Sequence, residues 1–122
     1  MPKTVLVVDD SASLRQIVCI ALNGAGYEVV EARDGKDALE KIDTRRIHLV
    51  ISDVNMPNMD GIAFVKELKQ RPECRYMPVI MLTTENQEKT IREGWIAGVK
   101  AWVVKPFHSA QIVSAVAKFI TP

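Results

Sequence analysis

The chain has 122 residues, of which 48% are hydrophobic and 25% charged, and this is the length and balance of one soluble globular domain. This composition excludes a disordered chain, a collagen repeat and a disulfide-rich scaffold, and the net charge of +1 provides no overall field for nucleic acid or an anionic membrane. Cys19 and Cys74 lie far apart and lack metal-ligand spacing. We therefore expect two reduced thiols in a cytoplasmic protein without a signal peptide or a membrane span.

Short apolar runs rich in β-branched or aromatic residues predict the strands. They lack the polar alternation of a half-exposed strand, so we expect them to be covered on both faces, as in a parallel sheet. In chain order the clear runs are residues 5–8, 49–51, 79–82 and 102–104, with a weaker candidate at 27–30.

Amphipathic segments between these runs predict the helices. Ser11 and Asp60 are placed to N-cap the first and third helices, about 36–43 and 86–97 form the second and fourth, and the last follows Pro106. The apolar positions at helical spacing are Leu14, Ile17, Val18, Ala21 and Leu22, then Ala38, Leu39 and Ile42, then Ile62, Phe64, Val65 and Leu68, and finally Ile112, Val116, Phe119 and Ile120. A β-α unit repeated five times predicts a single three-layer α/β domain over residues 1–122, without an attached output domain.

Polar residues directly follow four of the predicted strands. In an open α/β sheet, ligands bind at the carboxyl ends of the strands, where the connections diverge to opposite faces. We therefore expect three carboxylates, a hydroxyl and an ammonium group to meet in one pocket. The residues are Asp9-Asp10, Ser52-Asp53, Thr83-Thr84 and Lys105-Pro106.

This mixture of groups suits phosphoryl chemistry on a carboxylate. Three clustered carboxylates repel unless a cation neutralises them, and Mg²⁺ prefers carboxylate, carbonyl and water oxygens. Lys105 and Thr83 would then donate to an incoming anion, while Asp53, at the end of the central run, is the candidate nucleophile for an acyl phosphate. Taken singly, these residues could be a strand end, a turn residue, a helix cap or a solvated lysine. Their coincidence at four strand ends favours the site.

The same residues resemble the motifs of the response-regulator receiver domain, and within that family the stand-alone, CheY-like chemotaxis type. The resemblance covers nearly the whole chain and implies a doubly wound, flavodoxin-like sheet with strand order 2-1-3-4-5. The motifs are Val-Val-Asp-Asp-Ser at 7–11, Ser-Asp-Val-Asn-Met-Pro-Asn-Met-Asp-Gly at 52–61, Val-Ile-Met-Leu-Thr-Thr at 79–84 and Val-Val-Lys-Pro-Phe at 103–107.

The resemblance implies a role for each matching residue. Asp53 accepts a phosphoryl group from a phosphohistidine on a histidine kinase of the CheA type. Asp10, Asp53 and the backbone carbonyl of Asn55 bind Mg²⁺ directly, and Asp9 assists through water. Lys105 contacts the phosphoryl group, and its bond to the following proline is expected to be cis.

The resemblance also implies residues that change conformation on phosphorylation and residues that set the lifetime of the phosphoryl group. Thr83 moves toward the phosphoryl group, and Trp102, where Tyr, Phe or His is commoner, turns inward and reshapes the surface of the last two helices and the strand between them. The alternative is that Trp102 is fixed core packing. Asn55 and Glu85 occupy the two positions that tune the phosphoryl lifetime, and the chemotaxis type is similar at both. The expected partner surface comprises Thr90, Ile91, Lys100, Trp102 and Val113.

Together, the motifs and the resemblance predict a phosphorylation-switched signalling protein. We expect that it is not an enzyme, although it catalyses its own phosphorylation and dephosphorylation. Its expected target is the flagellar motor switch, and the alternatives are a phosphate sink, a relay intermediate or a regulator of another pathway. An aspartyl-phosphate phosphatase would need an acid where Asn55 stands, and an electron carrier would not place Asp9-Asp10 against the FMN phosphate. Ala110, Val113 and Ala117 of the last helix suggest a surface for docking or self-association, so that the protein is a monomer or a weak dimer, and the alternative is that these are scattered surface residues.

Overall fold

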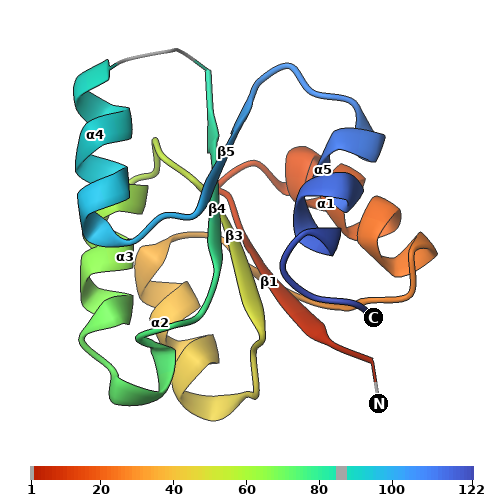
Figure 1. Cartoon of the computed structure of the whole chain (residues 1–122), viewed down its shortest axis with the longest axis horizontal. Coiled ribbons are helices and arrows are strands. Elements are labelled where there is room, and N and C mark those ends of the chain that lie inside the picture. The colour runs from red at the N-terminus through yellow and green to blue at the C-terminus, as the bar shows by residue number, and fades with distance from the viewer. Residues whose placement is uncertain (1, 85–87) are drawn as a thin grey trace.

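The computed structural model describes residues 2–84 and 88–122 and contains five strands, five helices and one 3₁₀ turn (Figure 1). Each predicted apolar run forms a strand and each amphipathic segment forms a helix, although residues 86 and 87 of the predicted fourth helix lie outside the described residues. The elements are β1 (Thr4–Val8), α1 (Ala12–Gly24), β2 (Glu28–Ala32), α2 (Gly35–Thr44), β3 (Leu49–Asp53), α3 (Gly61–Lys69), η1 (Pro72–Cys74), β4 (Val79–Thr83), α4 (Glu88–Ala97), β5 (Ala101–Val104) and α5 (Ser109–Ala117).

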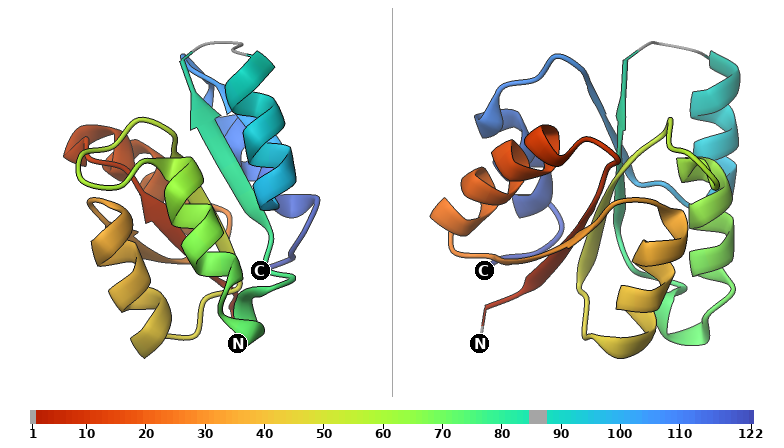
Figure 2. Two further views of the ribbon diagram at one scale, coloured as in Figure 1. Left: turned by 90° about the vertical axis from the view of Figure 1, so that its left-hand side faces the viewer. Right: turned by 180° about the vertical axis from the view of Figure 1, so that it is seen from behind.

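All strand pairs are parallel, and the sheet order is β2-β1-β3-β4-β5, which confirms the expected topology. Helices α1 and α5 cover one face, while α2, α3 and α4 cover the other, as the front and rear views show (Figures 1 and 2). Two hydrophobic cores result, one on each side of the sheet. The order reverses between β1 and β3, so the crevice at a topological switch point opens at the carboxyl ends of these strands.

The expectation that every strand is covered on both faces holds for the central strands but is wrong for the edges. Every residue of β3 and β4 is buried, whereas in β2 and β5 only Ala32 and Val103 are. Val104 of β5 is 45% exposed. An edge strand has a neighbouring strand on one side only, so part of its surface stays exposed at the edge of the sheet.

The predicted helix caps are confirmed, but two predicted core side chains are exposed. The side chain of Ser11 accepts the Leu14 N–H, and that of Asp60 accepts the Ala63 N–H. Ile17 of α1 is 50% exposed because Val18, Cys19 and Leu22 are the residues that α1 buries. Phe119 is 37% exposed because α5 ends two residues earlier, so helical spacing no longer directs its ring inward.

Both cysteines are buried free thiols, as expected for a chain without a disulfide. Burial, with a smaller contribution from Glu31, raises the pKa of Cys19 to about 11. None of the described helices is both long enough and apolar enough to cross a bilayer.

Candidate functional site

The residues of the candidate site lie at the carboxyl ends of four strands, along one edge of the sheet. Asp9 directly follows β1, Asp53 ends β3, Thr83 ends β4, and Lys105 directly follows β5. The parallel register fixes this arrangement, since Val8 pairs with Ser52, and Asp53 with Leu82. Asp9, Asp53 and Thr83 are among the few buried polar residues of the described chain.

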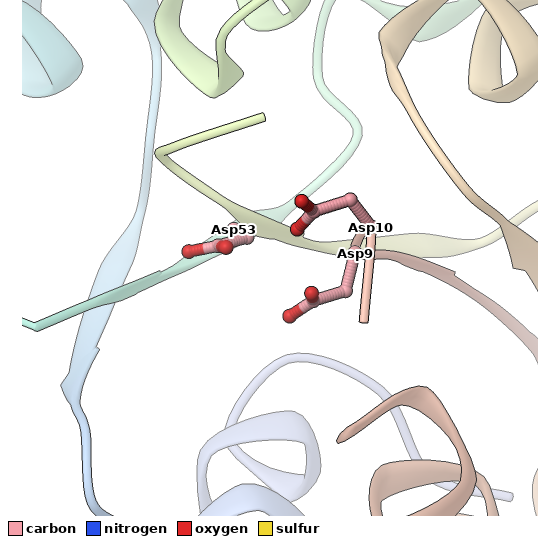
Figure 3. A group of neighbouring side chains, drawn as sticks. All are labelled: Asp9, Asp10 and Asp53. Carbon is pink, nitrogen blue, oxygen red and sulfur yellow. The ribbon is translucent and has the colours of Figure 1, made fainter. Parts of the chain in front are cut away.

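Asp9, Asp10 and Asp53 form an acidic cluster. One carboxylate oxygen from each lies within 4.8 Å of the others, and Figure 3 shows the three side chains gathered at the ends of β1 and β3. Asp10 is exposed, whereas Asp9 and Asp53 are buried. The cluster therefore has two protected carboxylates and one that faces solvent.

Lys105 supplies the positive charge at the cluster. Its Nζ lies 3.1 Å from Asp53 Oδ1 and 3.6 Å from Asp9 Oδ2. The Lys105 N–H donates to the Thr83 carbonyl at 2.7 Å, and the following bond to Pro106 is cis, as expected. One ammonium group thus contacts two carboxylates, so a fully ionised cluster keeps a net charge of −2.

Asp9 is held from both its side chain and its backbone. Its Oδ1 accepts the Ser11 N–H at 2.9 Å, and its carbonyl accepts a 2.6 Å hydrogen bond from Arg15 Nη1. Its Oδ2 is buried and has no hydrogen-bond partner within the described residues. Burial raises the pKa of Asp9, and Asp53 and Asp10 act in the same direction, against the Ser11 N–H and Lys105.

These observations fit a hard divalent cation. A buried carboxylate oxygen without a hydrogen bond is costly, and the only charged contact given above for Asp9 Oδ2, Lys105 Nζ at 3.6 Å, is longer than a hydrogen bond. The donor set is entirely oxygen and is under-neutralised by Lys105 alone, which is the chemistry that Mg²⁺ prefers. Asn55, the expected carbonyl ligand, is exposed two residues beyond Asp53 and lines a hollow of about 290 Å³ with Asp60 and Thr90.

Neither Ser52 nor Gly61, although both lie in the predicted motifs, was predicted to hold Asp53 in place. A Cβ at Gly61 would collide with the Asp53 carbonyl and lie 2.6 Å from Met81 Cε, so only glycine permits α3 to begin this close to β3. The Ser52 hydroxyl donates to the same Asp53 carbonyl at 2.9 Å. The only sequence signal was a glycine directly after the Asp60 cap, and it did not specify which backbone approaches.

Of the two expected switch residues, Thr83 lies at the candidate site, at the end of β4, whereas Trp102 and the expected partner residues lie on or next to α4, β5 and α5. Thr90, Ile91, Trp102 and Val113 are half-buried, and Lys100, just before β5, is exposed. The Trp102 ring contacts an α4 side chain, Trp95, edge to face at a centroid distance of 6.4 Å. Glu85, the second expected lifetime residue, lies outside the described residues.

Fold and site together define a flavodoxin-like α/β domain with an acidic site at the carboxyl edge of its sheet. The profile of the response regulator receiver domain matches residues 5–117, and the chain belongs to this family. Receiver domains take phosphoryl groups from histidine kinases and bind Mg²⁺ at an acidic pocket, and this chain has the acidic cluster Asp9, Asp10 and Asp53.

Known proteins of the family are similar over the full chain. The chain is 41% identical to chemotaxis protein CheY4 of Vibrio cholerae, with a TM-score of 0.95 over 98% of this chain and 100% of that one. It is 34% identical to the phosphate regulon transcriptional regulatory protein PhoB of Escherichia coli over all of this chain and 55% of PhoB, so it spans about half the length of such curated relatives. The receiver domain of the sensor histidine kinase PA1611 from Pseudomonas aeruginosa, which has a coordinated magnesium ion, is 23% identical with a TM-score of 0.88 over 98% of each chain and supports the fold.

Proposed function

We propose that this protein is a phosphorylation-switched response regulator in which Asp53 is the phosphoacceptor. The observation that carries the proposal is the placement of one buried carboxylate, Asp53, 3.1 Å from Lys105 Nζ and within 4.8 Å of two further carboxylates. A structural ion pair needs neither of those extra acids. A site that stabilises the charge of a transferring phosphoryl group needs both the acids and the lysine.

Mg²⁺ would be held by Asp10, Asp53 and the Asn55 carbonyl, with Asp9 assisting through water, and when bound it supplies positive charge beside the phosphoryl oxygens. A carboxylate oxygen of Asp53 forms a bond to phosphorus while the bond from phosphorus to the donor histidine nitrogen breaks. The electron pair of the broken bond stays on the imidazole. Lys105 remains beside Asp53 and stabilises the added negative charge.

The chain itself supplies the groups that promote this transfer, so the protein catalyses its own phosphorylation and dephosphorylation without acting on a separate substrate. Asn55 and Glu85 tune the lifetime of the acyl phosphate. Thr83, buried at the end of β4, responds to the phosphoryl group, and the α4-β5-α5 surface carries the output to a protein partner. The partner surface comprises Thr90, Ile91, Lys100, Trp102 and Val113.

A role in chemotaxis is the favoured pathway, with a CheA-type histidine kinase as donor and the flagellar motor switch as target. The similarity to CheY4 of V. cholerae over the full length of both chains supports it. A phosphate sink or relay intermediate is the second candidate, favoured if the acyl phosphate forms but the phosphorylated protein does not bind the purified motor switch protein more tightly.

The acceptor is tested by labelling with acetyl phosphate and Mg²⁺, followed by intact-mass and peptide analysis. The wild-type protein should gain one phosphoryl group on Asp53, and Asp53→Asn should gain none. Asp43→Asn, which removes an exposed carboxylate that is ion-paired with Arg71, is the matched control and should label as the wild type does. Stoichiometric labelling of Asp53→Asn at another residue would refute the assignment.

A further inference from the structure

The indole of Trp102 packs against a glycine of α4. A Cβ placed on Gly94 would overlap the six-membered ring of Trp102, lying 2.8 Å from Cη2 and closer still to Cζ2. The same Cβ would lie 3.3 Å from Ile62 Cδ1, so α3 also adjoins this contact. Trp102 therefore lies over the bare backbone of α4, on the side of the sheet that α3 and α4 cover.

This contact is central to the attachment of α4. Gly94 is the one buried residue within Glu88–Ala97, while Trp95 and Ile96 are 51% and 80% exposed. Helix α4 thus fully buries no large side chain of its own, since Ile91 is only half-buried, and the Trp102 indole supplies apolar bulk at this interface. Moving the indole out would leave a gap beneath α4 that the helix would have to close.

Packing rather than hydrogen bonding sets the orientation of the indole. The Trp102 Nε1 is buried and has no hydrogen-bond partner in the described part of the chain. An unpaired buried N–H opposes this orientation, so the surrounding contacts must compensate for it. The contacts that do so are the edge-to-face ring of Trp95 and the close approach at Gly94.

We propose that Gly94 is a positioning residue for Trp102: the absence of a side chain at 94 holds the indole inward and makes α4 and β5 shift together. This inference deepens the proposed function, because Trp102 lies on the proposed partner surface. Glycine destabilises a helix interior relative to alanine, so Gly94 lowers the stability of α4. The indole of Trp102 requires a glycine at this position. A change of Trp102 between inward and outward positions then necessarily moves α4.

The first test reports on Trp102 alone. Trp95→Phe leaves Trp102 as the sole tryptophan and preserves an aromatic ring at the edge contact. In that background, Gly94→Ala should increase acrylamide quenching of Trp102 by about twofold or more, with a red-shifted emission, because overpacking expels the ring. Gly24→Ala is the matched control, since a Cβ on this α1 glycine meets nothing within 4 Å, and it should leave the emission unchanged. Unchanged quenching in Gly94→Ala would overturn the inference.

The second test is a double-mutant cycle on thermal stability. Gly94→Ala should lower the melting temperature when Trp102 is present, and should raise it when Trp102 is replaced by valine, because only the gain in helix propensity then remains. If Gly94→Ala fails to fold, Trp102→Val should restore folding. A change of the same sign in both backgrounds, or no restoration, would contradict the role of Gly94.

The role of Gly94 and the proposed function can be contradicted by different results. Gly94→Ala should retain acetyl phosphate labelling of Asp53, because the contact lies outside the acidic cluster, while its binding to the purified motor switch protein should change. Absence of labelling in the wild-type protein would contradict the proposed function, and the fluorescence and stability results would still decide the role of Gly94.

Discussion

Asp10→Asn should stabilise the metal-free protein, because it removes charge from the acidic cluster without breaking an ion pair. Lys105 contacts Asp53 and Asp9, whereas Asp10 is in no salt bridge among the described residues. At 4.8 Å, the outer limit of the spacing in the cluster, each pair of ionised carboxylates repels by about 0.9 kcal/mol at the dielectric constant of water and about 3.5 kcal/mol at an effective value of 20. Since Asp10 is exposed, the lower figure applies, and relief of one of its two pairs alone should raise the melting temperature by about 4 °C.

The same substitution should abolish stabilisation by Mg²⁺. A ligand that binds only the folded state, at 100 times its Kd, stabilises by about 2.7 kcal/mol, so the wild-type protein should gain this and Asp10→Asn should not. The assay is thermal unfolding in EDTA and in MgCl₂, with NaCl of matched ionic strength. Glu40→Gln, which removes an exposed carboxylate of α2, is the control and should respond to Mg²⁺ as the wild type does. Lower stability of Asp10→Asn in EDTA, or an equal response to Mg²⁺, would refute the reasoning.

Two further predictions concern the residues that support the sheet ends. Gly61→Ala should cost about 1–3 kcal/mol in urea unfolding and lower the labelling of Asp53, since its Cβ collides with the Asp53 carbonyl; an effect no larger than that of Gly24→Ala would contradict this. His48 Nδ1 accepts the Thr4 N–H at 3.0 Å, and burial, helped by two nearby cations, lowers its pKa below the usual 6.5. The stability from neutral His48 is therefore complete above pH 6.5 and lost as pH falls through the lowered pKa. His48→Asn should flatten that dependence between pH 8 and 5, and an unchanged slope would exclude His48 as its source.

The parts of the fold that sequence predicted well are those set by local patterns. The runs 5–8, 49–51 and 79–82 are apolar on both faces, and this pattern is itself the consequence of burial between two helix layers. Exposure of Ile17 and Phe119 depends instead on how α1 is rotated and where α5 ends. Those features are set by tertiary packing, which residue spacing alone does not encode.

In the candidate site, too, some features follow from the sequence pattern and others from tertiary packing. Asp9, Asp53 and Lys105 were predicted to meet because parallel strands bring their carboxyl ends to one edge, so topology alone determines the proximity. Gly61 and Gly94 were not predicted as contacts, because each permits a close approach between segments far apart in the chain. A glycine in a sequence shows only that a side chain is absent. The structure is needed to show which atoms pack where that side chain would be.

The acidic cluster and the surface of α4 share one short strand. Lys105 directly follows β5, and Trp102 lies three residues earlier, about 10 Å along an extended chain. Between them Val104 pairs with Thr83, whose carbonyl accepts the Lys105 N–H. In the proposed function, a phosphoryl group on Asp53 that moves Thr83 would therefore act on β5 at its end. Because Trp102 is packed on the Gly94 backbone, a shift of that strand changes the position of α4 with no further contact required.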